Sequence, residues 1–541
     1  MTKSGVGTTA VPYAESGVSP FTSDGVIAGK PALTAEAMGW LAYCDRRVEI
    51  GGTWHRGDAP HVSWDNITFS PMSNYYRYEL TWLCFSVGVM ADQTPAWREL
   101  YAKHLDFYVS RLLEYWSFFD WIEARGPDPA REKYPEEWYE LLIPKGYRGK
   151  YDVPGWAGNG LNPYEYDPDP VRGNGTCNLM YKGYLELVLG MYRYVSDDGK
   201  YERPFQVVYD DQLIFEYDHK SLTELIAQQW LDTPTGFSCE VTKAWGVCNA
   251  LTGLGLKMFD STHGTHHIDS FELWLEHFRR EYVGNGLTDE PIDWYTLYYD
   301  KMIDANLHNE EHQSAFNWLA TAAMGLPHDR RLFERLYEGA MQRFYRPQND
   351  GTAYLIGMPG MELDDPWSTY CGFALASELG DVDRLGPLKA RMDRYHEPTW
   401  DTARGEFYVH SGLGEDWPRG QYNSFAQLGY AITKPGEWIN VFEKPNLAKF
   451  DQPTVEGVDY PTVRPRQAYW DEAEQALFIG LTSCDTDRLG TATQFRVTNL
   501  QPGADYRVTI DGHDQTIAAP DGSLEVHTDV GTHTILVRLA H

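Results

Sequence analysis

Two cysteines nine positions apart are the residues of this sequence best suited to chemistry. Cys239 is followed by Glu240, and Cys248 lies in the segment WGVCNALTGLGLKMFD. On one regular helix the two side chains would point to opposite faces, because each residue turns the helix by about 100°. We therefore expect the helix to begin between Glu240 and Lys243, with Cys239 on the preceding loop. Cys248 would then lie about one and a half turns inside the helix, and both thiols could face one pocket.

Such a pair of thiols has a definite chemical repertoire. Two thiols beside a carboxylate can supply an acid and a base, or one thiolate can form a covalent intermediate. Loss of water from an alcohol needs a proton for the leaving oxygen and a base for a neighbouring C–H bond. Aromatic rings such as that of Tyr184 could stabilise the positive charge that develops in between. In the alternative interpretation, each cysteine is a buried small hydrophobic side chain.

The elements that would position these residues are helices. From about Leu33 to Asn446, segments with small and aromatic residues on both faces alternate with amphipathic segments. NLMYKGYLELVLGMYRYV, SAFNWLATAAMGL and YCGFALASELGD are of the first kind, and RRLFERLYEGAMQRFY is of the second. A helix that is apolar most of the way round is buried on all sides. The alternation predicts an α/α toroid, with inner helices around an axis and outer helices covering them.

Two shorter regions flank the helical region, which we take as the catalytic domain, residues 33–446. Residues 1–32 are rich in Ser, Thr, Gly and Pro and are expected to form an extended arm. Residues 447–541 contain short segments rich in Thr, Val and Ile, such as QALFIGLTS and ADYRVTIDG, separated by turn residues. This pattern predicts a small antiparallel β-sandwich. We expect a separate packing module without catalytic side chains.

Composition limits the classes of function. The net charge of −32 over 541 residues argues against binding to nucleic acid and to anionic membranes. Seven cysteines without a C-x-x-C pair favour free thiols in a reducing cytoplasm and give no zinc-site spacing. With no phosphate-binding glycine loop either, we expect no metal and no cofactor. A secretory signal and an apolar run of about 18 residues are both missing, so we expect no membrane insertion.

Three segments resemble the linalool dehydratase-isomerase family. Cys-Glu is followed nine residues later by Cys-Asn, and the Met-Tyr-Lys-Gly helix of residues 178–192 precedes the pair in the family's order. MGWLAYCDRRVEIGGTWHRG is a weaker third match. The resemblance implies an (α/α)6 barrel, often assembled as a ring of identical chains. It implies cofactor-free addition or removal of water at an alkenol, with isomerisation of allylic alcohols. The C-terminal sandwich has no counterpart in this resemblance.

The resemblance also assigns residues by position. Cys239 and Cys248 match the two active-site thiols, Met180 matches a pocket methionine, and Tyr75 or Tyr76 matches a pocket tyrosine. In that family the N-terminal region of a neighbouring chain completes the pocket, so a homo-oligomer is expected. The substrate would be a small, mostly apolar alcohol or alkene. Further candidates for contact with the substrate are Trp245, Asn249 and Phe316.

The sequence departs from the family at three places. The histidine of the Met-Tyr-Lys-Gly helix is Tyr184 here, which makes Tyr184 a candidate catalytic residue. The acidic residue of the N-terminal segment falls on Val48, and the nearby tyrosine falls on Trp54. Asp45 and Glu49 flank Val48, so either could supply the missing carboxylate; Asp45 and Glu240 are our candidates. These departures concern the identity of the substrate more than the class of reaction.

A carbohydrate-active enzyme is the competing interpretation. Glycoside hydrolases, polysaccharide lyases and uronate epimerases also use α/α toroids, some followed by β-sandwiches, and this chain is 14% aromatic. The segment GMPGMELDDPW places Glu362, Asp364 and Asp365 beside aromatic residues at a possible rim. Glycoside hydrolysis needs two opposed carboxylates. A closed apolar cavity around Cys239 would favour the alkenol enzyme, and an open groove with Trp and paired carboxylates would favour sugars.

Overall fold

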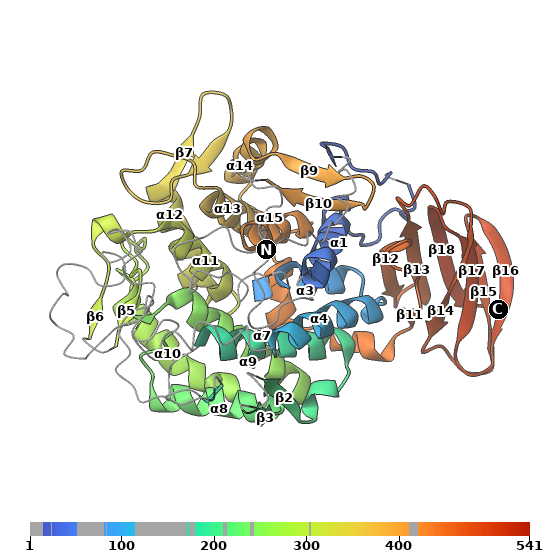
Figure 1. Ribbon diagram of the computed structural model, residues 1–541, viewed down its shortest axis with the longest axis horizontal. Helices are drawn as coiled ribbons and strands as arrows, with labels where there is room; N and C mark the ends of the chain where they lie inside the picture. Colours follow the sequence, from blue (N-terminus) through green and yellow to red (C-terminus); the bar gives the residue numbers. More distant parts are fainter. Residues whose placement is uncertain are drawn as a thin grey trace, which may run out of the picture.

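The computed structural model shows a helical body with an antiparallel β-sandwich at one end (Figure 1). The residues that the structure describes are 15–22, 24–50, 81–82, 84–113, 169, 171–172, 179–208, 212, 214–238, 243–301, 304–410 and 420–540. Cys239, Glu240, Trp54, Tyr75 and Tyr76 lie outside these residues. None of the described helices is long and apolar enough to cross a membrane.

Six of the described helices contact one another in a closed circuit. α7 contacts α9, α9 contacts α11, α11 contacts α13, α13 contacts α15, and α15 contacts α3, which returns to α7. Their bounds are α3 Phe85–Gln93, α7 Leu179–Ser196, α9 Gly246–His263, α11 Ala315–Gly325, α13 Pro366–Leu379 and α15 Gly420–Ala431. Nearly every residue of α7, α9, α11 and α13 is buried. The prediction of helices buried on all sides is confirmed for these segments.

Glycines let neighbouring helices of the circuit approach closely. A Cβ atom at Gly183 of α7 would lie 1.9 Å from Oγ1 of Thr252 on α9, and one at Gly190 would lie 3.0 Å from Cβ of Met258. Contact positions therefore advance in the same direction along both helices. Because α7 and α9 run parallel, their N-terminal ends lie side by side.

A second set of helices covers the circuit. α4 packs on α7, α12 on α11, α14 on α13, and α1 on α15, as in Figure 1. α12 is amphipathic as predicted, with one buried face. The bounds of this set are α1 Ala35–Ile50, α4 Arg98–Leu112, α8 His219–Asp232, α10 Phe271–His277 (continued by the π-turn Phe278–Tyr282), α12 Arg330–Phe344, α14 Val382–Tyr395 and α16 Glu437–Glu443.

Short antiparallel hairpins precede several helices of the circuit, where the sequence predicted only loops. β7–β8 lies between α12 and α13, and β9–β10 lies between α14 and α15. Their bounds are β1 Glu15–Ser16 (paired with β9), β2 Phe205–Val208, β3 Ile214–Tyr217, β4 Lys243–Ala244, β5 Tyr299–Asp300, β6 Ala305–Asn306, β7 Tyr345–Pro347, β8 Ala353–Leu355, β9 Pro398–Asp401 and β10 Glu406–Val409. Strands of two to four residues are too short for alternation to stand out in the sequence.

A polar side chain in the first turn fastens four of the circuit's helices to the chain that precedes them. In each case an amide or hydroxyl group binds a backbone N–H or C=O group of the connecting segment. The pairs are Asn249 with Phe237, Asn317 with Thr296 and Leu297, Thr369 with Leu355, and Asn423 with Val409. These bonds satisfy buried backbone groups that would otherwise destabilise the fold.

The C-terminal region forms two antiparallel sheets, as predicted. Their orders are β12-β13-β18-β15-β16 and β11-β14-β17. The bounds are β11 Thr454–Glu456, β12 Arg464–Asp471, β13 Ala476–Thr482, β14 Ala492–Thr498, β15 Ala504–Ile510, β16 His513–Ala519, β17 Leu524–Asp529 and β18 His533–Leu539.

The sandwich packs against the helical body. Buried side chains of both regions belong to one continuous hydrophobic core. Ala96, between α3 and α4, donates its N–H to the carbonyl of Ala468 and accepts from the N–H of Val455. The amide of Gln467 binds both the N–H and the C=O of Ile27 in the N-terminal arm. The arm is thereby fixed against β12.

Candidate active site

Tyr184 and Cys248, two of the residues singled out by the sequence, meet between α7 and α9. The phenol Oη of Tyr184 lies 3.8 Å from Sγ of Cys248, and either atom can be the donor. Both side chains are buried, with 1% and 2% of their surfaces exposed. Met180 is also buried and lies one turn before Tyr184 on the same face of α7. The structure therefore brings Tyr184, Cys248 and the helix face of Met180 together.

The start of α9 differs from the prediction. Residues 243 and 244 form strand β4, where Lys243 pairs with Asp300 of β5, and the helix begins only at Gly246. The ammonium of Lys243 is fully buried 3.4 Å from the carboxylate of Asp300, which holds this segment extended. Cys248 is consequently the third residue of α9 rather than one and a half turns inside. Free N–H groups at a helix N-terminus stabilise negative charge in this first turn.

Asn249 holds the chain that leads to Cys239. Its Oδ1 accepts from the N–H of Phe237 at 2.9 Å, and its Nδ2 donates to the carbonyls of Phe237 at 3.1 Å and Trp245 at 2.9 Å. The carbonyl of Ser238 also accepts from the N–H of Leu179, at the start of α7. Asn249 was expected to contact the substrate, but its amide is used to fix the backbone beside the first turns of α7 and α9.

Aromatic rings from four helical segments form a wall at the N-terminal ends of α11 and α13. Phe316, the second residue of α11, stacks on Trp367 of α13 with ring centroids 3.9 Å apart. The Trp82 ring lies 5.9 Å from Phe316, 5.6 Å from Trp367 and 5.6 Å from Phe425 of α15. We refer to these four residues as the aromatic wall. The sequence interpretation assigned only Phe316 to the site.

A signal for Trp367 was present in the sequence. Asp365 accepts the N–H of Ser368 as the N-cap of α13, and Pro366 occupies the first helical position. Asp-Pro at a helix start is a recognisable pattern. It would have placed Trp367 in the first turn of a buried helix, at the same level as Phe316.

Two aromatic residues flank the start of α9. Trp245 is the N-cap residue, and its ring lies 5.4 Å from that of Tyr298. A Cβ atom at Gly246 would lie 2.0 Å from Oη of Tyr295, which also lies 2.8 Å from Oγ1 of Thr321. Only glycine at position 246 therefore lets the Tyr295 hydroxyl approach the N-terminal end of α9. The sequence interpretation did not single out Tyr295.

Asp45 lies in a different part of the molecule. Its carboxylate contacts Nδ1 of His104 on α4. Both residues line a cavity between α1, α4 and the sandwich, and Tyr184 and Cys248 are not among the residues that line it. We therefore withdraw Asp45 as a partner of the thiols. The side chains of Val48 and Glu49 lie outside the described part of the chain.

The carboxylates that anchored the carbohydrate interpretation have structural partners. Glu362 pairs with Arg346 at 2.8 Å, and Asp364 pairs with both Arg391 and His396 at 2.7 Å. Burial opposes ionisation of Asp364, but His396 and Arg391 lower its pKa overall. Asp365 caps α13. These groups fix the segment before α13 instead of facing one another across a groove.

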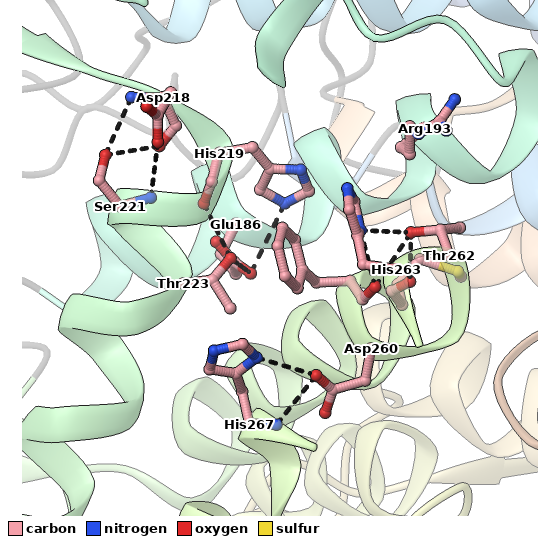
Figure 2. A network of polar contacts seen from close by, with 12 residues as sticks. Glu186, Arg193, Asp218, His219, Ser221, Thr223, Asp260, Thr262, His263 and His267 are labelled. Carbon is pink, nitrogen blue, oxygen red and sulfur yellow. Dashed lines mark hydrogen bonds and ion pairs between the residues drawn. The ribbon is translucent and has the colours of Figure 1, made fainter. Parts of the chain in front are cut away.

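The opposite face of α7 carries a second polar cluster (Figure 2). Glu186 and His219 are both fully buried, with a carboxylate oxygen 3.6 Å from Nε2. Glu186 also accepts from the hydroxyl of Thr223 at 2.8 Å, and Glu202 lies 3.8 Å from Nδ1 of His219. Burial opposes the charged imidazolium, yet the charges of Glu186 and Glu202 raise the pKa of His219 to about 9. The cluster joins α7 to α8 and is separate from the thiol site.

The family model described as linalool dehydratase/isomerase matches residues 156–411. This range contains α7, α9, α11 and α13, and therefore Tyr184, Cys248 and the Phe316–Trp367 pair. The resemblance to that family is confirmed over residues 156–411.

The solved structures that match this chain have low sequence identity and low structural similarity to it. An unsaturated glucuronyl hydrolase from Bacillus sp. GL1 has 12% identity and a TM-score of 0.37, over 76% of this chain and 95% of that one. A GH127 β-L-arabinofuranosidase from Geobacillus stearothermophilus T6 has 11% identity and a TM-score of 0.24, over 94% of this chain and 76% of that one. At these values neither structure bears on the activity of this protein.

Proposed function

We propose that this protein is a hydro-lyase or isomerase that removes water from, adds water to, or isomerises a small, mostly apolar alkenol. In this proposal the closed circuit is the inner ring of an (α/α)6 barrel, and Cys239 and Cys248 are the reactive pair. The contact between Tyr184 and Cys248, inside the segment that matches the family, is the observation that supports it most directly. A cytoplasmic location and assembly into a homo-oligomer stay predictions.

The proton balance of a dehydration fits a thiol and a phenol in contact. One group gives a proton to the hydroxyl oxygen, the C–O bond breaks, and water leaves. A second group takes a proton from the neighbouring carbon, and its electron pair forms the C=C bond. Because Oη of Tyr184 and Sγ of Cys248 are 3.8 Å apart, a proton can pass between them and restore the starting state after each turnover. Hydration is the same sequence in reverse.

Asn249 supports a role for Cys239 although Cys239 itself is outside the described residues. The clamp on Phe237 and the bond from Leu179 to Ser238 hold the chain beside the first turn of α9 up to the residue before Cys239. Cys239 is the next residue in the sequence. In the proposal Cys239 then completes the pair with Cys248.

The aromatic wall suits the intermediate that such a reaction passes through. The faces of Phe316 and Trp367 are stacked at the start of adjacent helices and are half-buried. Aromatic faces attract a cation without offering it a nucleophile, and an apolar lining excludes water that would trap it. We propose that this wall faces the apolar part of the substrate.

The decisive experiment measures turnover and thermal stability on the same variants. Purified protein is offered a panel of alkenols and, in parallel, a panel of oligosaccharides. Cys239→Ala and Cys248→Ala should each lower alkenol turnover by at least about a hundredfold, the range expected for loss of an acid or base. Tyr184→Phe should lower turnover if its hydroxyl carries a proton. Cys371→Ala is the control, because Cys371 is a fully buried thiol of α13 that we assign no chemistry.

Two outcomes would end the proposal. One is full alkenol activity in both Cys239→Ala and Cys248→Ala. The other is turnover of oligosaccharides with none of alkenols, which would establish the carbohydrate interpretation instead. Loss of activity in Cys371→Ala equal to that in Cys248→Ala would show that the assay reports stability and not chemistry.

A further inference from the structure

A cavity of about 660 Å³ lies where the helical body meets the sandwich. It is lined by α1, α4, the turn between β9 and β10, the segment before β12, and the segment after β13. Pockets of about 300–1,000 Å³ accommodate small molecules. The cavity is distinct from the Tyr184–Cys248 site, because neither residue lines it.

Arg464 brings a buried positive charge to this cavity. Only 3% of Arg464 is exposed. Its guanidinium donates to the main-chain carbonyls of Pro461 at 3.0 Å, Gly405 at 2.6 Å and Arg404. Carbonyl groups satisfy these donors but carry no net charge. A buried guanidinium is costly without an opposite charge, and Arg464 forms no ion pair with any described carboxylate.

Two of the three carboxylates of the lining have other partners. Asp45 contacts Nδ1 of His104, and Glu406 is paired with Arg46. The third, Asp485, accepts from the N–H of Arg488 at 3.3 Å and forms no ion pair with a described residue, as is also true of Arg464. The exposed Lys103 of α4 adds another cation to the lining, and no described residue pairs with it. Arg464 and Lys103 therefore line the cavity without an ion pair to any described carboxylate.

Apolar side chains also line the cavity. The apolar side chains come from α1, α4 and the segment that precedes β12, and are Ala42, Leu100, Phe107 and Pro461. The cavity therefore offers both cationic and apolar side chains to a ligand. A ligand that fits both must carry one negative charge and an apolar body.

We propose that this cavity binds a small amphipathic carboxylate, with the carboxylate at Arg464 and Lys103 and the apolar part against α1 and α4. A guanidinium has five donors, of which three are used by carbonyls here, so two remain for a carboxylate. The site lies outside the thiol site, so the inference stands whether or not the proposed alkenol activity is correct.

The test is a calorimetric titration of the full chain with octanoate as the probe. Octan-1-ol has the same apolar body without charge, and acetate has the charge without the body. Octanoate should bind saturably, and at least about tenfold more tightly than either, the ratio expected for losing one charged or apolar contact. Glucuronate tests whether a polar body serves equally well. The proposal would be overturned if octan-1-ol, acetate or glucuronate bound as tightly as octanoate, or if octanoate showed no saturable binding.

Three variants locate the binding without disturbing the buried Arg464. Lys103→Glu should weaken octanoate by about three- to tenfold, because it reverses an exposed charge of the lining. Ala403→Trp, at an exposed position of the lining, should obstruct the cavity and also weaken binding. Lys220→Glu is the control, since Lys220 is exposed on α8 away from the cavity. Octanoate affinity unchanged in Lys103→Glu and Ala403→Trp, or lowered equally in Lys220→Glu, would refute the assigned site.

Discussion

Asn249 couples the stability of the fold to the geometry of the thiol site. Replacing it with leucine keeps the volume but leaves the N–H and C=O groups of Phe237 without their partners. We expect Asn249→Leu to lower the free energy of unfolding by about 2–4 kcal/mol, the range for orphaned buried polar groups. Denaturant unfolding measures this loss. Turnover per folded molecule should also fall, because the chain before Cys239 loses its anchor.

Asn423→Leu is the matched control for that variant. Asn423 makes the same two-bond clamp on α15, to the N–H and C=O of Val409. It should lower stability by a similar amount and leave turnover per folded molecule unchanged. Equal losses of turnover in the two variants would mean that Asn249 has no special connection with the thiols.

His219 makes the stability of the protein sensitive to alkaline pH. The pKa of its side chain is raised to about 9 by Glu186 and Glu202 against the opposing effect of burial, whereas an unfolded histidine has a pKa of about 6.5. The folded state thus binds the proton more tightly. This contribution, about 3 kcal/mol, is fully present below pH 6.5 and is lost as the pH rises through 9.

The prediction is tested by unfolding free energies measured from pH 6 to 10. The wild-type protein should lose more stability over this range than His219→Gln, and the difference between the two should shrink towards pH 10. His527→Gln is the control, since His527 is exposed on β17. A constant difference between wild type and His219→Gln across the range would refute the assignment of charge to His219.

At the scale of elements, residue pattern predicted the buried helices of the circuit and the strands of the C-terminal sheets, but not the short strands β1–β10. Four helices of the circuit, α7, α9, α11 and α13, are buried on nearly all sides and alternate with amphipathic helices. This alternation is visible in the sequence itself. The start of α9 was missed because it depends on Asp300, 57 residues after Lys243 in the chain. A tertiary ion pair of this kind leaves no local signal.

The candidate site was predictable only in part for the same reason. Met180, Tyr184 and Cys248 lie in segments with a recognisable pattern, and the structure brings Tyr184 and Cys248 into contact. Asp45 was chosen for its position beside Val48, and nothing in the sequence indicated that His104 would bind it. The recurrence of a polar residue in the first turn, as in VCN, AFN and QYN, was visible but had no meaning without the backbone groups it binds.

The pairing of α7 with α9 rests on Gly183. A methyl group there would lie 1.9 Å from Oγ1 of Thr252, whose hydroxyl donates to the carbonyl of Cys248 at 2.8 Å. We expect Gly183→Ala to destabilise the protein by about 1–3 kcal/mol through overpacking, measured by denaturant unfolding. It should also lower turnover by moving the first turn of α9. Gly199→Ala is the control, because the nearest atom to a Cβ there is 3.6 Å away. A neutral Gly183→Ala would show that the two helices separate readily.

At the scale of the whole molecule, the interface between the helical body and the sandwich determines how the chain unfolds. Ala96 bonds to Ala468 and Val455, Gln467 holds the arm at Ile27, and one hydrophobic core runs through both regions. Regions that share a core lose contacts together, so we expect one cooperative transition in place of two.

Val537→Ala tests this cooperativity from within the sandwich. Val537 of β18 is 1% exposed, and its truncation should cost about 2 kcal/mol. Because the core is continuous, calorimetry should show a single transition at a lower temperature. Tryptophan fluorescence, to which residues 447–541 contribute only Trp470, should shift with it, although the atoms removed belong to the sandwich. Val382→Ala is the control, because Val382 on α14 is 75% exposed, and it should leave the transition temperature unchanged. Two transitions, with Val537→Ala moving only one of them, would establish that the sandwich folds as an independent unit.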